Sequence, residues 1–237
     1  MAVELSVVIP AYNEESRIRP TLEEYAAVLR ASRTPNFELL VVLNGCRDST
    51  RAVVEDVAAS AGEVRIVEFA EPLGKGGAIH RGLDLASGGL LAYVDADNMV
   101  RAGETVRLID ALSDYSIAIA DRFRGTQTNG GQPLLRRVVS RGSRLWVRRY
   151  LGLPYSDTQC GAKAFRAEAW RMIAPSIREH GWAFDLEVLA HARRLGLSVA
   201  EIPVRWQHVA EGSKVQPWRD APATLLSTLR IKRRVRG

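Results

Sequence analysis

Two aspartates, Asp95 and Asp97, come directly after the apolar run Leu90–Val94, separated by one alanine. Two carboxylates at this spacing, where the chain leaves a strand, can converge on one hard divalent cation. Mg²⁺ and Mn²⁺ fit, because both bind carboxylate oxygens together with the phosphate oxygens of a substrate. The alternative is a turn with two solvated aspartates. The position at a strand end favours the metal site, since ligands of open α/β sheets bind beyond the carboxyl ends of the strands.

Three further polar segments follow other apolar runs and could bind the rest of a phosphorylated ligand. The segments Pro10–Glu14 and Asn44–Thr50 carry amide and acid groups that suit a nucleobase edge and ribose hydroxyls. In Gly74–Ala78, glycines let the backbone approach phosphates at a helix start, and Lys75 adds a positive charge. Each segment is also compatible with ordinary turn and cap chemistry. The glycine-rich segment matches neither a Walker A loop nor a dinucleotide fingerprint.

The elements that must position these residues alternate along the first half of the chain. Short aliphatic runs predict buried parallel strands at 5–9, 37–43, 64–69, 90–94 and 117–120. Helices are predicted between them, at about 15–31, 49–59, 75–86 and 104–112. This alternation predicts an α/β fold with a doubly wound, mostly parallel sheet, right-handed crossovers and helices on both faces.

The second half of the chain is less regular. A glycine-rich polar loop at 125–133 precedes a basic helix at about 134–150, and the segment 157–166 follows without an assigned element. Two helices, one or two strands broken at Pro203 and a C-terminal helix are predicted near 167–174, 184–195, 199–208 and 221–236. Apolar positions of the C-terminal helix are taken by Leu225, Leu226, Leu229 and Ile231.

Charge is divided unevenly along the 237 residues. Residues 1–120 carry 11 Lys and Arg against 18 Asp and Glu, and residues 121–237 carry 22 against 9. The second half is therefore expected to handle an anion or an anionic surface. No run approaches the ~18 apolar residues of a membrane-spanning helix. The two cysteines, Cys46 and Cys160, are too few for a disulfide framework, so a reduced cytoplasmic protein is expected.

The order of the motifs is more specific than any one of them. Pro10–Glu14, the turn ending Asp48–Thr50, the Gly74–Gly76 loop and the Asp95–Asp97 pair, in this order, resemble the family 2 glycosyltransferases of the GT-A fold. The segments 157–165, 181–187, 201–206 and 212–214 look like the dolichyl-phosphate glucosyltransferase branch, with dolichyl-phosphate mannose synthases as close relatives. The resemblance covers about residues 4–216.

This resemblance implies a single GT-A domain at 1–216, and the residue pattern beyond it predicts a basic amphipathic helix at 217–237. Within the domain, 1–120 would bind the nucleotide sugar and 121–216 the acceptor. It also implies roles for individual residues. Those nearest the chemistry would be Asp97, Asp185, Arg122 and Lys214. The nucleotide sugar would be bound by Pro10, Tyr12, Glu14, Asn44, Gly74, Lys75, Asp95 and Gln159. Ser213 would bind the acceptor phosphate, and Asp95 and Asp97 would bind Mg²⁺ or Mn²⁺. The positive charge of the second half adds Arg136 and Arg137 as further residues for the acceptor phosphate.

Three positions depart from the family pattern. The second strand usually ends in Asp-Asp-Gly-Ser, whereas this chain has the Asn44–Arg47 segment. Ala120-Asp121-Arg122 replaces a Gly-Ser-Arg triplet but keeps its arginine, and Ala162 stands where phenylalanine is common.

The function implied is inverting, metal-dependent transfer of a hexose from a nucleoside diphosphate sugar to a polyprenyl phosphate. UDP-glucose is the favoured donor and GDP-mannose the alternative. A phosphate acceptor is already anionic near neutral pH, so it needs cations to hold it rather than a base. A hydroxyl acceptor, such as a glycan or glycerate, would instead need a carboxylate base, for which Asp185 is the candidate.

Two other function classes fit part of the sequence. A nucleic-acid-binding module would explain the basic half, but it leaves the acidic strand ends without a role, and no nucleic-acid partner is expected. A nucleotidyltransferase would also combine a glycine-rich loop with metal-binding carboxylates. The C-terminal helix is expected either to contact an anionic membrane surface, peripherally at the inner face of the membrane, or to pack on the core with a solvated basic end.

Overall fold

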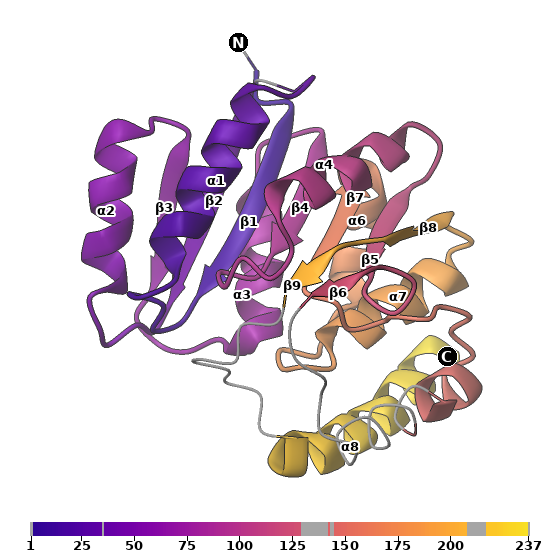
Figure 1. The fold of residues 1–237 in the computed structure, drawn as a ribbon. Coiled ribbons are helices and arrows are strands. Elements are labelled where there is room, and N and C mark those ends of the chain that lie inside the picture. Colours follow the sequence, from indigo (N-terminus) through magenta and orange to yellow (C-terminus); the bar gives the residue numbers. More distant parts are fainter. Residues whose placement is uncertain (1, 35, 129–141, 143–144, 208–216, 237) are drawn as a thin grey trace.

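The fold is a seven-stranded mixed sheet between two layers of helices (Figure 1). The structure is a computed structural model that describes residues 2–34, 36–128, 142, 145–207 and 217–236. The sheet runs in the order β3-β2-β1-β4-β7-β5-β8. Its strands are β1 (Leu5–Ala11), β2 (Phe37–Asn44), β3 (Val64–Phe69), β4 (Leu90–Val94), β5 (Ile117–Asp121), β7 (Ala162–Arg166) and β8 (Val199–Pro203). A separate two-stranded sheet pairs β6 (Gln127–Thr128) with β9 (Trp206–Gln207).

Strand direction confirms the predicted mostly parallel sheet. All neighbouring strands of the large sheet are parallel except β7, which runs antiparallel to both β4 and β5. No strand is predicted for β7, because two alanines and Lys163 interrupt the β-branched pattern that marks the other strands. Burial between two neighbours, rather than the preference of its own residues, makes this segment a strand.

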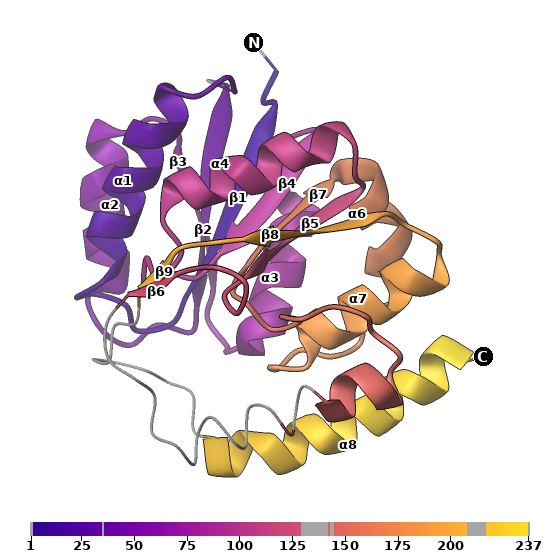
Figure 2. The ribbon, with the colours of Figure 1, turned by 45° about the vertical axis from the view of Figure 1, so that its right-hand side comes forward.

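The helices cover both faces of the sheet, as expected. They are α1 (Ile18–Arg30), α2 (Thr50–Ser60), α3 (Gly74–Leu85), α4 (Ala102–Asp110), α6 (Ala167–Ile173), α7 (Phe184–Arg194) and α8 (Pro217–Arg236). Residues 145–150 are also helical, and short 3₁₀ turns lie at Ala111–Ser113 and Ala174–Ser176. Figure 2 shows α1 and α4 in front of the sheet, with α3 and α7 behind it. No helix of the described part of the chain combines the length and the apolar composition needed to cross a bilayer.

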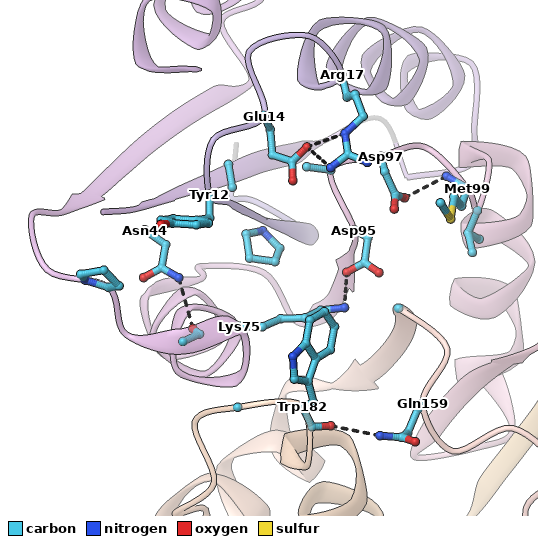
Figure 3. A pocket seen from close by; sticks show the side chains of 18 of the residues that line it. Tyr12, Glu14, Arg17, Asn44, Lys75, Asp95, Asp97, Met99, Gln159 and Trp182 are labelled. Carbon is cyan, nitrogen blue, oxygen red and sulfur yellow. Dashed lines mark hydrogen bonds and ion pairs between the residues drawn. The ribbon is translucent and has the colours of Figure 1, made fainter. Parts of the chain in front are cut away.

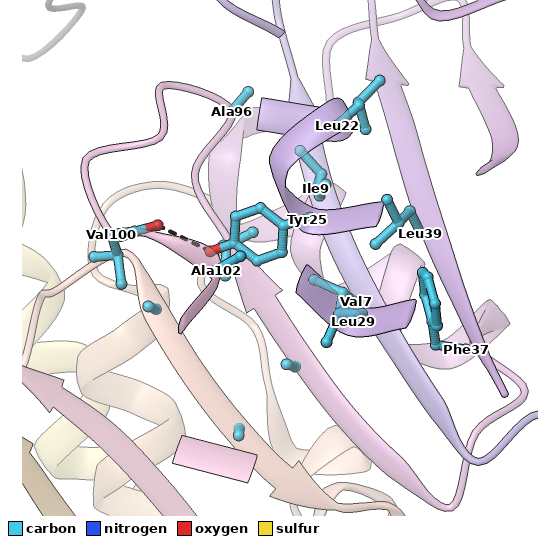
Figure 4. Close-up of a cluster of buried hydrophobic side chains, with 14 of the residues drawn as sticks. Val7, Ile9, Leu22, Tyr25, Leu29, Phe37, Leu39, Ala96, Val100 and Ala102 are labelled. Atoms are coloured by element: carbon cyan, nitrogen blue, oxygen red, sulfur yellow. Dashed lines mark hydrogen bonds between the residues drawn. The ribbon is translucent and has the colours of Figure 1, made fainter. Parts of the chain in front are cut away.

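The core has two parts, one on each side of the sheet. Successive strand side chains point to opposite faces, so Val7 packs under α1, α2 and α4, while Val8 packs against α3 and α7. Figure 4 shows the first part around Tyr25 of α1, which is fully buried. The Tyr25 hydroxyl donates a hydrogen bond to the Val100 carbonyl, 2.9 Å away. Helix α1 is thereby tied to the chain that follows the Asp95 and Asp97 pair.

Candidate active site

A pocket of about 470 Å³ opens at the carboxyl ends of β1, β2 and β4, beside the start of α3 (Figure 3). Both halves of the chain contribute to it. The lining residues are Pro10, Ala11, Tyr12, Glu14, Arg17, Asn44, Pro72, Gly74, Lys75, Asp95, Ala96, Asp97, Met99, Val100, Arg122, Gln159, Gly161, Gly181, Trp182 and Trp206. All eight residues predicted to bind a nucleotide sugar are among them, together with Asp97 and Arg122.

The loop that carries Asp95 and Asp97 is fixed by its neighbours. Thr21 of α1 donates a hydrogen bond from its hydroxyl to the Ala96 carbonyl, 2.9 Å away, in a buried position. The Asp95 N–H donates to the Gly161 carbonyl at 3.1 Å. The Asp97 carboxylate accepts a hydrogen bond from the Met99 N–H at 3.1 Å. The backbone of this loop and the Asp97 carboxylate are therefore held in place by the protein itself.

These carboxylates suit a hard cation. Burial and then the nearby charge of Asp95 raise the pKa of Asp97 to about 6. A divalent cation bound between the two carboxylates would offset the repulsion that the Asp95 charge exerts on Asp97. The described residues hold no group of three or more His, Cys, Asp and Glu side chains that could bind a metal, so further ligands would have to come from elsewhere.

Lys75 is a cation that lies against Asp95 of this pair. Its Nζ is 2.6 Å from Asp95 Oδ1 and 5.1 Å from the centre of the Trp182 ring (Figure 3). Burial disfavours the charged ammonium, but the carboxylates of Asp95 and Asp185 outweigh it and raise the pKa of Lys75. Lys75 therefore stays protonated, and it can hold either a carboxylate or a phosphate of a ligand.

The glycine-rich loop before α3 has a backbone that only glycine adopts easily. Gly74 has a φ of 76°, and a Cβ there would lie 2.5 Å from the His180 carbonyl oxygen. The Asn44 side chain braces the same loop, because its Oδ1 accepts from the Leu73 N–H at 2.7 Å and its Nδ2 donates to the Gly74 carbonyl at 3.2 Å. Asn44 lines the pocket, yet both ends of its amide are engaged by the loop.

Arg122, at the end of β5, is held by a buried acid. Its Nε and Nη2 donate to the two carboxylate oxygens of Asp157 at 2.7 and 2.9 Å, and its backbone N–H donates at 3.1 Å. The guanidinium lies 5.7 Å from the ring centres of both Phe123 and Trp206. Burial raises the pKa of Asp157, but the charge and hydrogen bonds of Arg122 outweigh it and leave that pKa below its usual value. Asp157 therefore fixes the orientation of the Arg122 guanidinium, which lines the pocket.

Asp185 is placed differently from the other predicted residues. It is buried and is not among the described residues that line the pocket. Its Oδ1 lies 2.5 Å from Lys163 Nζ and accepts a hydrogen bond from the Tyr93 hydroxyl. Lys163 is itself buried and also donates to the Cys160 carbonyl at 2.9 Å. This network lies under the pocket, joining α7 to β4 and β7.

A match to a protein-family model shows the family of this chain. The model described as glycosyl transferase family 2 matches residues 6–173. The chain belongs to glycosyl transferase family 2. It is 35% identical over 231 residues to a dolichyl-phosphate β-glucosyltransferase of Drosophila melanogaster, covering 92% of this chain and 71% of the relative. The Homo sapiens enzyme of the same name is 32% identical, covering 91% and 70%.

The glycosyltransferase also resembles longer proteins and solved structures. It is 34% identical to the glycosyltransferase AglD of Haloferax volcanii, but it spans only 35% of that protein's length. Glucosyl-3-phosphoglycerate synthase of Mycobacterium tuberculosis, solved with UDP, has a TM-score of 0.70 at 21% identity, covering 98% of this chain and 80% of that one. The same enzyme solved with Mn²⁺, UDP-glucose and phosphoglyceric acid has a TM-score of 0.68 at 22% identity, with the same coverage. These structures confirm the GT-A fold.

Several lining residues of the glycosyltransferase were not predicted. Arg17 pairs with Glu14 at 2.6 Å. The two residues are three positions apart just before α1, and this spacing could have indicated the ion pair from the sequence. Trp182 lies within a segment that carries the family resemblance, whereas Trp206 comes into the pocket from the distant β9. Four predicted residues lie outside the part of the chain that the structure describes, namely Arg136, Arg137, Ser213 and Lys214.

Proposed function

We propose that this glycosyltransferase moves glucose from UDP-glucose to a polyprenyl phosphate of the dolichyl type. The observation that carries the proposal is the pocket in which Asp95 and Asp97 face Lys75, with Arg122 also in its lining. Two carboxylates and two cationic side chains around a pocket of this size suit a diphosphate bound through a divalent cation, with a second phosphate nearby. The names of the relatives support the acceptor, since several are dolichyl-phosphate β-glucosyltransferases.

The donor is proposed on related grounds. The relatives are named as glucosyltransferases, and the Mycobacterium tuberculosis enzyme of the same fold was solved with Mn²⁺ and UDP-glucose. GDP-mannose remains the alternative donor, to be separated by experiment. Tyr12, 41% exposed at the end of β1, offers a ring face to a base of either kind.

Asp95 and Asp97 would hold the metal, and the fit rests on their oxygen donors and on the raised pKa of Asp97. A bound Mg²⁺ or Mn²⁺ would supply Lewis-acid stabilisation of the departing diphosphate. Lys75 can contact the same diphosphate, because its ammonium already lies against Asp95. The backbone at the start of α3 adds N–H groups that attract phosphate.

The acceptor side needs positive charge more than it needs a base. A phosphate monoester is already a nucleophile near neutral pH, so its main obstacle is repulsion by the donor diphosphate. Arg122, oriented by Asp157, supplies one fixed cation there. Direct attack on the sugar in one displacement would invert the anomeric carbon. The buried ion pair of Asp185 with Lys163 agrees with a reaction that does not use Asp185 as its base.

The proposal is tested by following radiolabelled glucose. UDP-[¹⁴C]glucose is incubated with Mn²⁺ and either dolichyl phosphate or hydroxyl acceptors, and GDP-[¹⁴C]mannose is run in parallel. We expect label in the lipid extract with UDP-glucose, and a loss of at least about 100-fold with Asp97→Asn. Asp110→Asn, an exposed aspartate on α4, is the matched control and keeps full activity. Label only in hydroxyl acceptors, or an unlabelled lipid extract, would overturn the proposed acceptor.

A further inference from the structure

Exposed apolar side chains gather on two helical segments away from the pocket. Leu225, Leu226 and Leu229 of α8 are 46, 54 and 40% exposed, and Leu145 and Trp146 are 66 and 41% exposed. A leucine that folding leaves half in water loses much of the free energy that burial would provide. Such side chains are ordinary when scattered, but a group of five on adjoining helices marks an interaction surface.

The two segments form one surface. The indole N–H of Trp146 donates to the Thr228 hydroxyl at 3.2 Å, and the Lys232 ammonium donates to the Tyr150 carbonyl. Trp146 and Tyr150 are stacked, with ring centres 4.8 Å apart. Figures 1 and 2 both show the helical residues 145–150 lying beside α8. We call the exposed side chains of Leu145, Trp146, Leu225, Leu226 and Leu229 the outer apolar face.

The opposite side of α8 already holds the helix on the protein. Ile231 is fully buried in the core, and the Ser227 hydroxyl donates to Glu179 at 2.7 Å. Arg234 donates to Glu179 at 3.0 Å and to Glu187 at 2.7 Å. At about 100° per residue, Leu225, Leu226 and Leu229 span an arc that faces away from these contacts. The three leucines are therefore not needed to dock α8.

Positive charge surrounds the outer apolar face. Arg148, Arg149, Arg230 and Arg233 are exposed, and residues 145–150 and 223–235 include no aspartate or glutamate. Cations next to an anionic bilayer contribute roughly 1 kcal/mol each, and tryptophan favours the boundary between headgroups and acyl chains. A second copy of this chain would bring like charges together, which opposes self-association through this face.

We propose that the outer apolar face is a docking surface for an anionic lipid bilayer. Its leucines and Trp146 enter the acyl boundary, while the flanking arginines contact lipid phosphates. Figures 1 and 2 place α8 toward the end of the molecule to which β1 and β2 point. The pocket opens at that same end, so docking brings its mouth toward the membrane. The inference rests on exposure and charge alone and holds for any acceptor.

Sedimentation with vesicles tests the docking surface. The protein is mixed with vesicles of phosphatidylcholine alone or with 25% phosphatidylglycerol, both free of polyprenyl phosphate. We expect binding to the anionic vesicles, weakened at least tenfold in a Leu225→Ser/Leu226→Ser/Leu229→Ser variant. The control Met172→Ser/Leu195→Ser changes residues that are 51 and 41% exposed elsewhere, and it binds as the unchanged protein does. Thermal melting verifies that each variant is folded.

The charge contribution is tested separately. Arg149→Gln/Arg233→Gln is expected to weaken binding to anionic vesicles about tenfold and to flatten its salt dependence. Triple-serine protein that binds anionic vesicles as tightly as the unchanged protein would overturn the proposal. So would a lipid-free dimer that the serine substitutions dissociate, because the face would then belong to a second copy. Since the vesicles contain no acceptor, neither result bears on the proposed glucosyl transfer.

Discussion

The substitution Gly161→Ala should displace the Asp95 carboxylate of the candidate metal site while leaving both aspartates in the sequence. A Cβ at residue 161 would lie 1.9 Å from Asp95 Oδ2 and 2.4 Å from its Cγ. Non-bonded carbon and oxygen atoms rest more than about 3 Å apart, so the carboxylate has to retreat by about 1 Å or more. Its backbone cannot follow freely, because the Asp95 N–H is bonded to the Gly161 carbonyl.

A displacement of this size has a predictable effect on catalysis. A misplacement of about 1 Å in a catalytic group can lower the rate about 100-fold, so we expect kcat/KM for UDP-glucose to fall by about that factor. Mn²⁺ binding in the presence of UDP, measured by calorimetry, should weaken in parallel. Stability should change little, since the carboxylate can rotate into the pocket. The pair with Lys75, 2.6 Å long in the structure, should break.

Two other glycines provide matched controls. A Cβ at Gly181, which also lines the pocket, or at Gly103 of α4 meets no atom within 4 Å. Gly181→Ala and Gly103→Ala are therefore expected to keep metal affinity and turnover within about twofold, because no atom has to move. Should Gly161→Ala bind Mn²⁺ and turn over donor as well as these controls do, the reasoning that makes Asp95 part of the metal site is refuted.

Two further predictions concern the buried ion pairs. Asp185→Asn leaves Lys163 buried without its counter-charge, so unfolding should be easier by about 3 kcal/mol and the melting temperature lower by roughly 6–12 °C. Adding Lys163→Met should restore part of the lost stability. If Asp185 were instead a catalytic base, Asp185→Asn would lower turnover without changing the melting temperature. Asp157→Asn should lower the stability by about 2–3 kcal/mol at pH 7. Because the pKa of Asp157 is lowered by folding, its contribution is present at neutral pH and is lost as the pH falls below about 4, so the melting temperatures of Asp157→Asn and unchanged protein should converge there.

The pocket could be predicted from the sequence because parallel strands bring their ends together. Pro10, Asn44 and Asp95 lie at the carboxyl ends of three neighbouring strands, and in a doubly wound sheet such ends meet at one edge. The type and position of each polar segment therefore sufficed to place these residues in one site. Gly74 and Lys75 lie in the same site because α3 begins at this edge of the sheet.

Roles that depend on packing could not be predicted in the same way. Asn44 has the residue type of a base-reading group, but its amide is bonded to Leu73 and Gly74 instead. Asp185 begins a helix next to the pocket, and only the structure shows that buried Lys163 engages it. Lys163 itself gave no signal, because no strand is predicted around it and a lysine is usually expected on the surface.

The antiparallel strand β7 has a consequence for how the site is made during synthesis. β4 and β5 lie on either side of it, and its residues 162–166 follow them by more than 40 positions in the chain. In a growing polypeptide, Asp95 therefore lies at an edge of the sheet that β7 has not yet covered. The carbonyl of Gly161 that receives the Asp95 N–H, and the strand that covers this edge, emerge together. Donor-binding competence should thus arise in one late step of translation, and chains released before about residue 166 should lack it.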